Sequence, residues 1–381
     1  MQITARIANL EREDAERRDR ESYLKRTTRP IREPRPRAAV IGAGISGLIC
    51  ARTLLDHGIE VATFEKSRGL GGRMATRRTA DGPTFDHGAQ YFTVRDERFE
   101  QCVTSWREDG IVAPWEGRIG AVTNGDLEWK QKTTPRFVGV PGMNAICRHL
   151  AADHDIQFRT RVGPPKLDHG LWQLCDELGK QLGEFDCAIT SAPAPQSAEL
   201  LAAAPDLQRQ ANSTRMHGCW AAMLAFDASL GLPFDGAFVH GSPLSWIARN
   251  DSKPGRGSAG EAWVLHASPE WSGQYIDEEA EKVLPKMINA FWQATGAQRR
   301  ATSYAAGHKW RYAIPPEPLD SPCLFDPQLR IGACGDWCGG PRVEGAFLSG
   351  KALAGYVLSA FDSKSTSSAP NATIARESPG E

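Results

Sequence analysis

Short apolar runs alternate with helical patterns in several parts of the chain. Residues 38–41 form a continuously apolar run, as a parallel strand covered on both faces requires. A helical pattern of apolar positions follows over 45–57 and stops at Gly58, and residues 59–64 predict a second parallel strand. This order predicts a Rossmann-type α/β domain. Segments assigned to the same domain are a helix over 143–152 and buried strands over 186–191 and 329–334.

A different pattern occupies residues 203–316. Several strand-like segments occur here, and Val283, Met287, Ile288 and Phe291 lie on one face of a predicted amphipathic helix. We therefore predict a mixed-sheet α+β substrate domain inserted into a discontinuous cofactor-binding domain. The strand-like segments are 220–226, 238–240 and 263–266. The predicted boundaries are a charged leader over 1–36 that is disordered or one helix, a cofactor-binding domain over 37–105, 141–202 and 317–362, a substrate domain over 106–140 and 203–316, and a disordered tail over 363–381.

Charge and cysteine content argue against several classes of function. A formal net charge of −1 over 381 residues offers no basic surface for nucleic acid or an anionic membrane. The nine cysteines include no Cys-x-x-Cys pair, so we expect reduced thiols and no metal site. The apolar stretch 38–55 is interrupted by Gly42, Gly44 and Gly47 and begins too late in the chain for an export signal. We expect a cytoplasmic protein without a membrane anchor.

The first chemical motif, Gly42-Ala43-Gly44-Ile45-Ser46-Gly47, joins the first strand to the first helix. In such a G-x-G-x-x-G pattern the first glycine allows a tight turn, the second lets the backbone approach a pyrophosphate, and the third lets the helix pack closely on the strand. The helix N-terminus offers free N–H groups to the phosphates. Glu65 ends the second strand, where a carboxylate can bind ribose hydroxyls. The segment therefore predicts a dinucleotide site.

Two further segments favour FAD over a nicotinamide dinucleotide as the resident cofactor. Arg73 can offer forked donors to phosphate or flavin oxygens, and no His or Cys lies in a recognisable flavin-attachment motif, so we expect non-covalent binding. The segments resemble the glycine-doublet, flavin-edge and C-terminal motifs of the flavin amine oxidase and renalase superfamily. Their residues are Lys66, Gly71-Gly72-Arg73-Met74 and Gly88-Ala89-Gln90 in the first, and Gly335-Asp336 and Arg342-Val343-Glu344-Gly345-Ala346 in the second.

This resemblance implies an FAD-binding domain of the p-hydroxybenzoate hydroxylase and amine oxidase type. It also implies that Asp336 binds the ribityl chain and that the turn at Glu344 opens a helix aimed at the pyrimidine ring of the flavin. The physical reason is that reduced flavin carries negative charge, which a helix N-terminus stabilises.

The chain is similar to the bacterial renalases over about residues 36–361. The resemblance implies an oxidase that takes a hydride from the 2- and 6-dihydronicotinamide isomers of NAD(P)H to flavin N5 and gives NAD(P)+. Oxygen then reoxidises the flavin and gives H2O2. The residues that carry the resemblance, besides the cofactor segments, are Trp246, Ala248-Arg249-Asn250, Ser252-Lys253-Pro254, Leu265-His266-Ala267, Trp271-Ser272, His308 and Trp310.

Aromatic and polar residues of the inserted domain are candidates for the substrate pocket. Aromatic rings can stack on a nicotinamide ring, polar groups can orient its amide, and cations can bind its phosphates. We expect His308 to be structural. The candidate pocket residues are Arg249, His266, Trp310, Arg311, Tyr312 and Gln90.

Two alternatives to a dihydronicotinamide oxidase stay open at this point. One is a flavin amine oxidase or desaturase-type enzyme acting on another small substrate. Amine oxidases usually carry a lysine near flavin N5, and Ala221 stands at that position by our alignment, which argues against this alternative. The other is a flavin-binding protein without turnover. For the dihydronicotinamide reaction we expect no general base, while the competing hypothesis assigns that role to His266 or Lys309.

Overall fold

The computed structural model describes residues 35–80, 82–131, 134–257 and 260–367, with only the backbone described for 363–367. The chain divides into two compact units, residues 1–36 and 37–381, and all that follows concerns the second. The predicted leader over 1–34 and the predicted tail beyond 367 lie outside the described residues.

A six-stranded sheet has β1 (Arg37–Ile41) at its centre, paired in parallel with β2 (Glu60–Glu65) and β13 (Cys187–Thr190). Side chains of β1 alternate between two cores, because successive residues of a strand point to opposite faces. Ala38 and Val40 pack toward the helices α2 and α10, while Ala39 and Ile41 pack on the other face. This double coverage confirms the predicted parallel strand. The sheet order is β19 (Leu324–Asp326), β20 (Ile331–Ala333), β13, β1, β2 and β9 (Ile156–Phe158).

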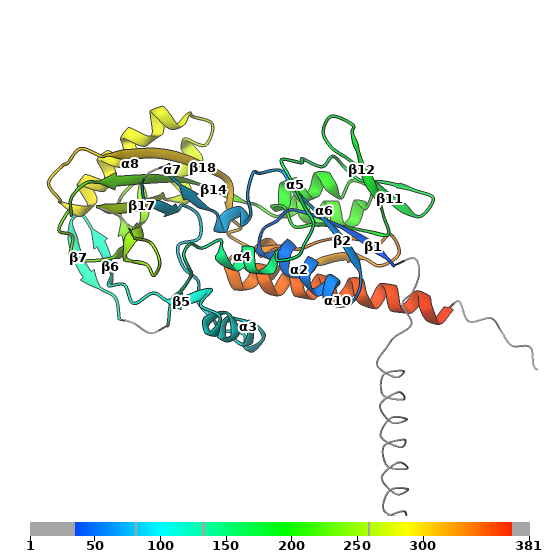
Figure 1. Cartoon of the computed structure of the whole chain (residues 1–381). Helices are drawn as coiled ribbons and strands as arrows, with labels where there is room; N and C mark the ends of the chain where they lie inside the picture. Colours follow the sequence, from blue (N-terminus) through cyan, green and yellow to red (C-terminus); the bar gives the residue numbers. More distant parts are fainter. Residues whose placement is uncertain (1–34, 81, 132–133, 258–259, 368–381) are drawn as a thin grey trace, which may run out of the picture. The chain divides into compact units, whose positions relative to one another are not determined.

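Helix α2 (Ile45–Asp56) follows β1 directly and packs against α10 (Val343–Ser367) (Figure 1). Gly350 lies at their contact, since a Cβ there would overlap the carbonyl oxygen of Ser46. Gly58 has a φ of +81° just after α2, as predicted for a helix-stopping glycine. The last helix therefore lies beside the first, and the two ends of the predicted cofactor domain meet.

The predicted disordered tail begins too early. Helix α10 continues through Asp362 to Ser367 instead of ending at residue 362. Leu353, Val357 and Phe361 are buried and hold the helix on the sheet, and the chain between Gly355 and Pro370 contains no residue that breaks a helix. Within the described residues, no helix is both long and apolar enough to cross a membrane.

The second sheet has seven strands and is mainly antiparallel, with β15 and β6 paired in parallel. Helix α8 (Ala280–Thr295) covers one face of β14, β17 and β18, where Val283, Met287 and Phe291 are buried, as the amphipathic pattern predicted (Figure 1). The strand order is β18 (Tyr304–Ile314), β14 (His217–Phe226), β17 (Glu261–Ala267), β16 (Leu244–Arg249), β15 (Gly236–His240), β6 (Ile119–Thr123) and β7 (Asp126–Trp129).

Smaller elements connect and flank the two sheets. A three-stranded meander of β10 (Lys166–Asp168), β11 (Leu171–Cys175) and β12 (Gln181–Phe185) was not predicted. The remaining helices are η1 (Gly72–Met74), α3 (Glu97–Glu108), α4 (Ala145–Leu150), α5 (Ala194–Leu200), α6 (Pro205–Ser213), η2 (Asn250–Ser252), α7 (Pro269–Gln274) and α9 (Asp336–Gly339). The remaining strands form the pairs β3 (Thr76–Arg78) with β4 (Thr84–Asp86) and β5 (Val112–Pro114) with β8 (Phe137–Gly139).

Candidate functional site

The glycine-rich loop after β1 has the geometry that its sequence predicts. Gly42 has a φ of +111°, which favours glycine. A Cβ at Gly47 would overlap both the carbonyl oxygen of Gly42 and Oγ of Ser191. The hydroxyl of Ser191 donates to that same carbonyl oxygen at 3.0 Å. Gly42 and Gly47 are therefore required by the fold itself.

Gly44 differs from its neighbours because no described residue lies close enough to require a glycine there. Its backbone is extended, with φ −79° and ψ 174°, and a Cβ would meet no atom within 4 Å. It caps α2, and no side chain caps the helix at that end. Free N–H groups and the helix dipole at such an end attract an anion. The open space beside Gly44 thus fits a phosphate group.

Glu65 fixes this loop from the end of β2. Its buried carboxylate accepts hydrogen bonds from the backbone N–H of Ala43 at 2.8 Å and of Ser67 at 2.7 Å. Two charge-assisted bonds to the main chain hold the loop in one conformation. Contact with a ribose stays a prediction. Lys66 is exposed, and its Nζ donates to Oε1 of Gln196 at 3.1 Å.

The glycine doublet lies directly beside the loop. The N–H of Gly71 donates to the carbonyl oxygen of Ala43 at 2.9 Å, and a Cβ at Gly72 would come within 3.7 Å of Gly44 Cα. The N–H of Ala89 in turn donates to the carbonyl oxygen of Arg73 at 2.8 Å. The loop, the doublet and the segment 88–90 therefore lie side by side, although they are separated in sequence. Ile45 and Met74 are buried around them, and Ser46 lies in the first turn of α2.

The guanidinium of Arg73 binds Asp336 instead of pointing freely toward a ligand. Nη1 lies 2.6 Å from Oδ2 and Nη2 lies 2.8 Å from Oδ1, and Nη1 also donates to the carbonyl oxygen of Ala313 at 2.9 Å. A fork of parallel N–H donors matches the two oxygens of a carboxylate. The sequence predicted both residues at the cofactor but not their pairing. The backbone of Gly335 is held by Oγ of Ser349 at 3.0 Å.

The turn before α10 is fixed by Glu344. Its buried carboxylate accepts from the backbone N–H groups of Arg95 at 2.7 Å and Asp96 at 2.9 Å, just before α3. A Cβ at Gly345 would overlap the carbonyl oxygen of Gly340. A helix does open here, at Val343, and its first turn includes the bond from Ala346 N–H to the Arg342 carbonyl oxygen. Its aim at a pyrimidine ring stays a prediction.

The seven-stranded sheet brings two histidines to either side of Ala221. In the register of the sheet, Ala221 on β14 pairs with His266 on β17 and with His308 on β18, so the three side chains share the face opposite α8. His266 Nε2 lies 3.1 Å from the carbonyl oxygen of His87, which also accepts from Trp310 Nε1 at 2.9 Å. Ala221 is fully buried in this arrangement.

These histidines are neutral near pH 7. Burial, followed by the nearby His308, lowers the pKa of His87 to about 3. Burial likewise lowers the pKa of both His266 and His308 to about 4. The sheet face around Ala221 therefore presents aromatic rings and neutral nitrogens. His308, predicted to be structural, lies with its ring centroid 4.7 Å from that of His87 and 4.3 Å from that of Trp310.

An aromatic cluster continues this face onto β16. Trp246 pairs with His266 in the register, and its ring centroid lies 4.8 Å from Phe238, 5.7 Å from Tyr91 and 6.5 Å from Trp115. Trp246 Nε1 and His87 Nδ1 are buried without a hydrogen-bond partner among the described residues. An unpaired buried polar group costs about 1–3 kcal/mol, so both atoms mark positions where a ligand could bond. No role was predicted for this cluster, and Trp246 was noted only among the residues that carry the family resemblance.

The six pocket candidates do not lie in one pocket. His266 and Trp310 lie together at the His87 carbonyl oxygen. Arg249 contacts three carboxylates, Asp235, Asp251 (3.8 Å) and Glu261 (3.7 Å), so its charge is already balanced. The expected role of Arg249 as a free phosphate ligand does not agree with this geometry.

Arg311 and Tyr312 lie elsewhere on β18. Nη2 of Arg311 donates to Asp277 at 2.8 Å, on the same side as Lys309, whose Nζ donates to the carbonyl oxygen of Glu278 at 3.2 Å. This side is the one that α8 covers, since Lys309 also lies over the Trp220 ring. Arg311 and Tyr312 line a groove of about 540 Å³, together with Met216, His217, Gly218, Pro269, Glu270, Gly273 and Ile276.

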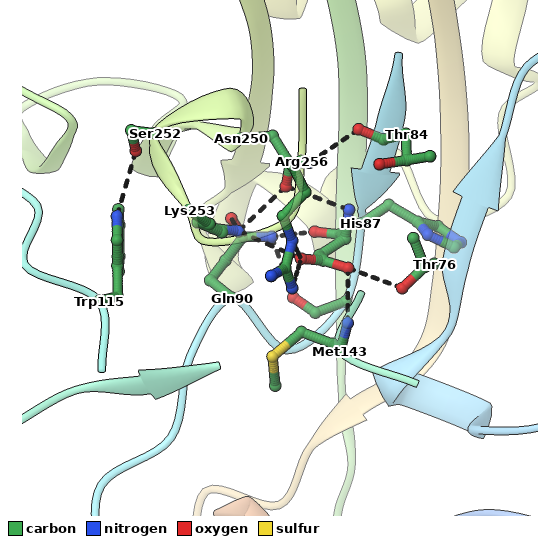
Figure 2. A network of polar contacts seen from close by, with 12 residues as sticks. Thr76, Thr84, His87, Gln90, Trp115, Met143, Asn250, Ser252, Lys253 and Arg256 are labelled. Atoms are coloured by element: carbon green, nitrogen blue, oxygen red, sulfur yellow. Dashed lines mark hydrogen bonds and ion pairs between the residues drawn. The ribbon is translucent and has the colours of Figure 1, made fainter. Parts of the chain in front are cut away.

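Gln90, the sixth candidate, belongs to a buried polar cluster around Asp86 (Figure 2). Lys253 Nζ donates to Gln90 Oε1 and to Asn250 Oδ1, both at 3.1 Å, and lies 3.6 Å from Asp86 Oδ2. Arg256 donates to the same Oδ2 through Nε at 3.0 Å and Nη2 at 2.6 Å. The other Asp86 oxygen accepts from Thr76 Oγ1 at 2.7 Å and from Met143 N–H at 3.0 Å.

The charges in this cluster perturb one another. Burial alone would raise the pKa of Asp86, but Lys253, Arg256 and the hydrogen bonds outweigh it and lower that pKa below its usual value. Burial lowers the pKa of Lys253 to about 8. Lys253 was noted in the sequence only as part of a matching segment, without a role. No group of three His, Cys, Asp or Glu residues in the described part of the chain is placed to hold a metal ion.

Comparison with known proteins agrees with the geometry of the glycine-rich loop and the glycine doublet. Residues 40–115 match the profile of the NAD(P)-binding Rossmann-like domain. The 4,4'-diapophytoene desaturase of Staphylococcus aureus (strain MRSA252) is 48% identical over 73 residues, which are 18% of this chain and 14% of the desaturase. The L-glutamate oxidase precursor of Streptomyces diastatochromogenes is 44% identical over 64 residues, which are 16% of this chain and 10% of that protein. These matches span about a tenth to a seventh of the relatives' own length.

Solved structures match over most of the chain at low sequence identity. Cyclohexylamine oxidase from Brevibacterium oxydans IH-35A has a TM-score of 0.66 and 11% identity, covering 86% of this chain and 100% of that chain. An oxidoreductase from Methanosarcina mazei has a TM-score of 0.62 and 13% identity, covering 83% of this chain and 99% of that chain. This likeness confirms the predicted fold, a Rossmann-type domain combined with a second, mixed sheet.

Proposed function

We propose that this protein is an FAD-dependent oxidoreductase that oxidises 2- and 6-dihydronicotinamide isomers of NAD(P)H to NAD(P)+. The observation that carries the cofactor assignment is the open space at Gly44. It lies at the uncapped N-terminus of α2, between a loop fixed by Glu65 and the glycine doublet. A pyrophosphate there would meet the free N–H groups of the helix N-terminus.

FAD, when bound, would accept a hydride from the substrate and pass two electrons to O2, giving H2O2. The chain's contribution is to bind and to orient. Gly44, Gly72 and the first turn of α2 would hold the pyrophosphate, and the segment 88–90 would lie along the flavin edge. The binding is proposed as non-covalent, so acid precipitation should leave the yellow cofactor in the supernatant. Colour retained in the pellet would contradict this.

The sheet face around Ala221 supports the choice of substrate. A dihydronicotinamide already holds, on its ring nitrogen, the electron pair that drives hydride departure, and its product is an aromatic cation. No proton has to be removed first, so a face of aromatic rings and neutral histidines suffices. Trp246 and Trp310 can stack on or border the ring. The buried Nε1 of Trp246, which lacks a partner among the described residues, could bond to the carboxamide oxygen.

A second candidate is amine or desaturase-type oxidation. The local similarity to the diapophytoene desaturase and the glutamate oxidase precursor favours it, as does the shared fold with cyclohexylamine oxidase. Ala221 argues against it, because it stands where amine oxidases usually carry a lysine, and here it lies fully buried between His266 and His308.

Anaerobic mixing of the FAD-loaded protein with single substrates separates the candidates. We expect rapid loss of the oxidised-flavin absorbance with the 2- and 6-dihydro isomers and slow loss with the 4-dihydro form. Reduction by small amines alone would favour the second candidate. A bound flavin that no hydride donor reduces would indicate a flavin-binding protein without turnover.

A further inference from the structure

The cluster around Asp86 holds one positive charge in excess. The side chains of Asp86, Lys253 and Arg256 are 0%, 0% and 1% exposed, so one carboxylate faces two cations away from water. Buried charges are normally paired, because removing an ion from water costs several kcal/mol. Among the described residues, this cluster therefore has one anion fewer than it has cations.

The excess charge lies on Lys253 and not on Arg256. Arg256 takes Asp86 Oδ2 with two donors at 2.6 and 3.0 Å, whereas Lys253 stands 3.6 Å from that oxygen. The hydrogen bonds of Lys253 go to Gln90 and Asn250, whose amide oxygens are neutral. The other groups facing it are the Trp115 ring at 5.6 Å and the neutral His266. Among the described groups that act on Lys253, Asp86 is the one anion.

Gln90 accepts a hydrogen bond from Lys253 (Figure 2), and its neighbours in the chain lie against the segments that surround the Gly44 space. It follows Ala89, whose N–H is bonded to the Arg73 carbonyl oxygen, and Gly88 packs against the same carbonyl group. The Arg73 segment continues from the doublet beside Gly44. Lys253 thus contacts, through the side chain of Gln90, the segment 88–90 that is proposed to border the flavin.

We propose that Lys253, acting through Gln90, is the positioning cation that stabilises the anionic reduced form of the bound flavin. This inference rests on the proposed function. Hydride transfer brings two electrons and one proton to a neutral flavin and leaves it with one negative charge. Two cations would then face two anions, Asp86 and the flavin, and the cluster would be neutral. At pH 7 Lys253 keeps its proton before and after hydride transfer, and no other reactant is needed. It directly follows η2, a different element from the strand that carries Ala221.

The test is the reduction potential of the FAD-loaded protein as a function of pH, measured with a chemical reductant and reference dyes. Burial lowers the pKa of Lys253 to about 8 with Asp86 as its neighbouring anion, and a second anion nearby would raise it. Above that pH the oxidised form has lost the lysine proton, so reduction must take up one more proton. The potential of the wild type should therefore fall more steeply above about pH 8. The additional fall is about 30 mV per pH unit, which for two electrons is a further factor of ten in the equilibrium constant of reduction.

Two matched methionine variants locate the effect. Lys253→Met should lose the steeper part of the pH profile. At pH 7 its preference for reduced over oxidised flavin should be at least tenfold lower than that of the wild type, which lowers the potential by about 30 mV. Arg256→Met removes the other cation of the same cluster. It should keep the steeper part of the pH profile and move it to higher pH, because Arg256 lowers the pKa of Lys253.

Each outcome bears on the inference. A wild-type potential without a change of slope above pH 8 would overturn it, and this measurement needs no variant to fold. Identical pH profiles for the two variants would also overturn it, since they would indicate a merely structural cluster. A protein that binds no FAD fails the proposed function as well. FAD binding with a normal change of slope, but no reduction by dihydronicotinamides, would refute only the proposed substrate.

Discussion

The loop at Gly44 and the cluster at Asp86 are built on different principles. The loop comes from one stretch of chain, and its main-chain groups are held by Glu65 and by neighbouring carbonyl oxygens. The cluster joins β4 to residues 250–256 and depends on charged side chains that water does not reach. Changes in the loop should therefore act through added volume, and changes in the cluster through lost charge.

The largest effect should come from adding a side chain inside the loop. Gly47→Val would force a side chain into the Gly42 carbonyl group and Ser191, so we expect little folded protein. Gly44→Val is the matched control, because a Cβ there meets no protein atom. It should unfold within a few degrees of the wild type yet bind FAD at least 100-fold more weakly. Thermal unfolding and flavin titration measure the two effects. Full FAD content in Gly44→Val would show that the phosphates bind elsewhere.

Next in size is the loss of the cluster's carboxylate. Asp86→Asn leaves two buried cations without an anion and should cost about 3–5 kcal/mol in the free energy of unfolding. The pKa of Asp86 is lowered in the folded protein, so its stabilisation is present above the unfolded pKa and disappears as the pH falls through the folded value. Urea unfolding between about pH 7 and 3 should show a steeper acid loss for the wild type than for Asp86→Asn.

Thr76→Val is the control for that experiment. It removes one hydrogen bond to Asp86 and keeps all three charges, so it should cost only about 1 kcal/mol. An equal loss in both variants would mean that packing, not charge, explains the stability of the cluster.

A smaller effect should follow from loosening the loop. Glu65→Ala removes two charge-assisted bonds, to Ala43 and Ser67, and should weaken FAD binding by about 1.5–3 kcal/mol. Lys66→Ala, next in the chain, removes an exposed contact to Gln196 and should leave the affinity nearly unchanged. Isothermal titration of the flavin-free protein compares them. An effect of Lys66→Ala as large as that of Glu65→Ala would contradict the role of the carboxylate.

The same contrast explains what the sequence could and could not predict. The strands at 37–41 and 60–65, the turn at Gly42 and the close contact at Gly47 follow from neighbouring residues, so local patterns predicted them. The pairing of Arg73 with Asp336 and the balanced charge of Arg249 depend on contacts between residues far apart in sequence.

The register of the second sheet could not be predicted from the sequence either. Three of its seven strands, β14, β15 and β17, were predicted, but which residues flank Ala221 depends on how β14, β17 and β18 align. A lysine in the segment 252–254 carried no local signal that it would be fully buried. Such a position is fixed by the tertiary fold, and a pattern read along one chain cannot give it.

The smallest effects should come from the two residues that could act as a general base. Lys309 lies on the sheet side covered by α8, with its Nζ bonded to the Glu278 carbonyl oxygen, so Lys309→Ala should leave the rate of flavin reduction unchanged. His266 lies on the flavin-facing side in our proposal, but its Nε2 is engaged with the His87 carbonyl oxygen. His266→Ala should lower the rate less than tenfold, through looser packing.

Because burial lowers the pKa of His266 to about 4, it stays neutral above about pH 6, and the wild-type rate should be flat from there to the pKa of Lys253. The flat profile alone does not separate the hypotheses, since a neutral base would also be active in that range, so the variants decide. Stopped-flow reduction by a 6-dihydronicotinamide at saturating concentration is the measurement. A loss of 10²–10⁴ in the rate of flavin reduction in either variant is the usual contribution of a general base. It would contradict the view that holding the ring against the flavin is enough.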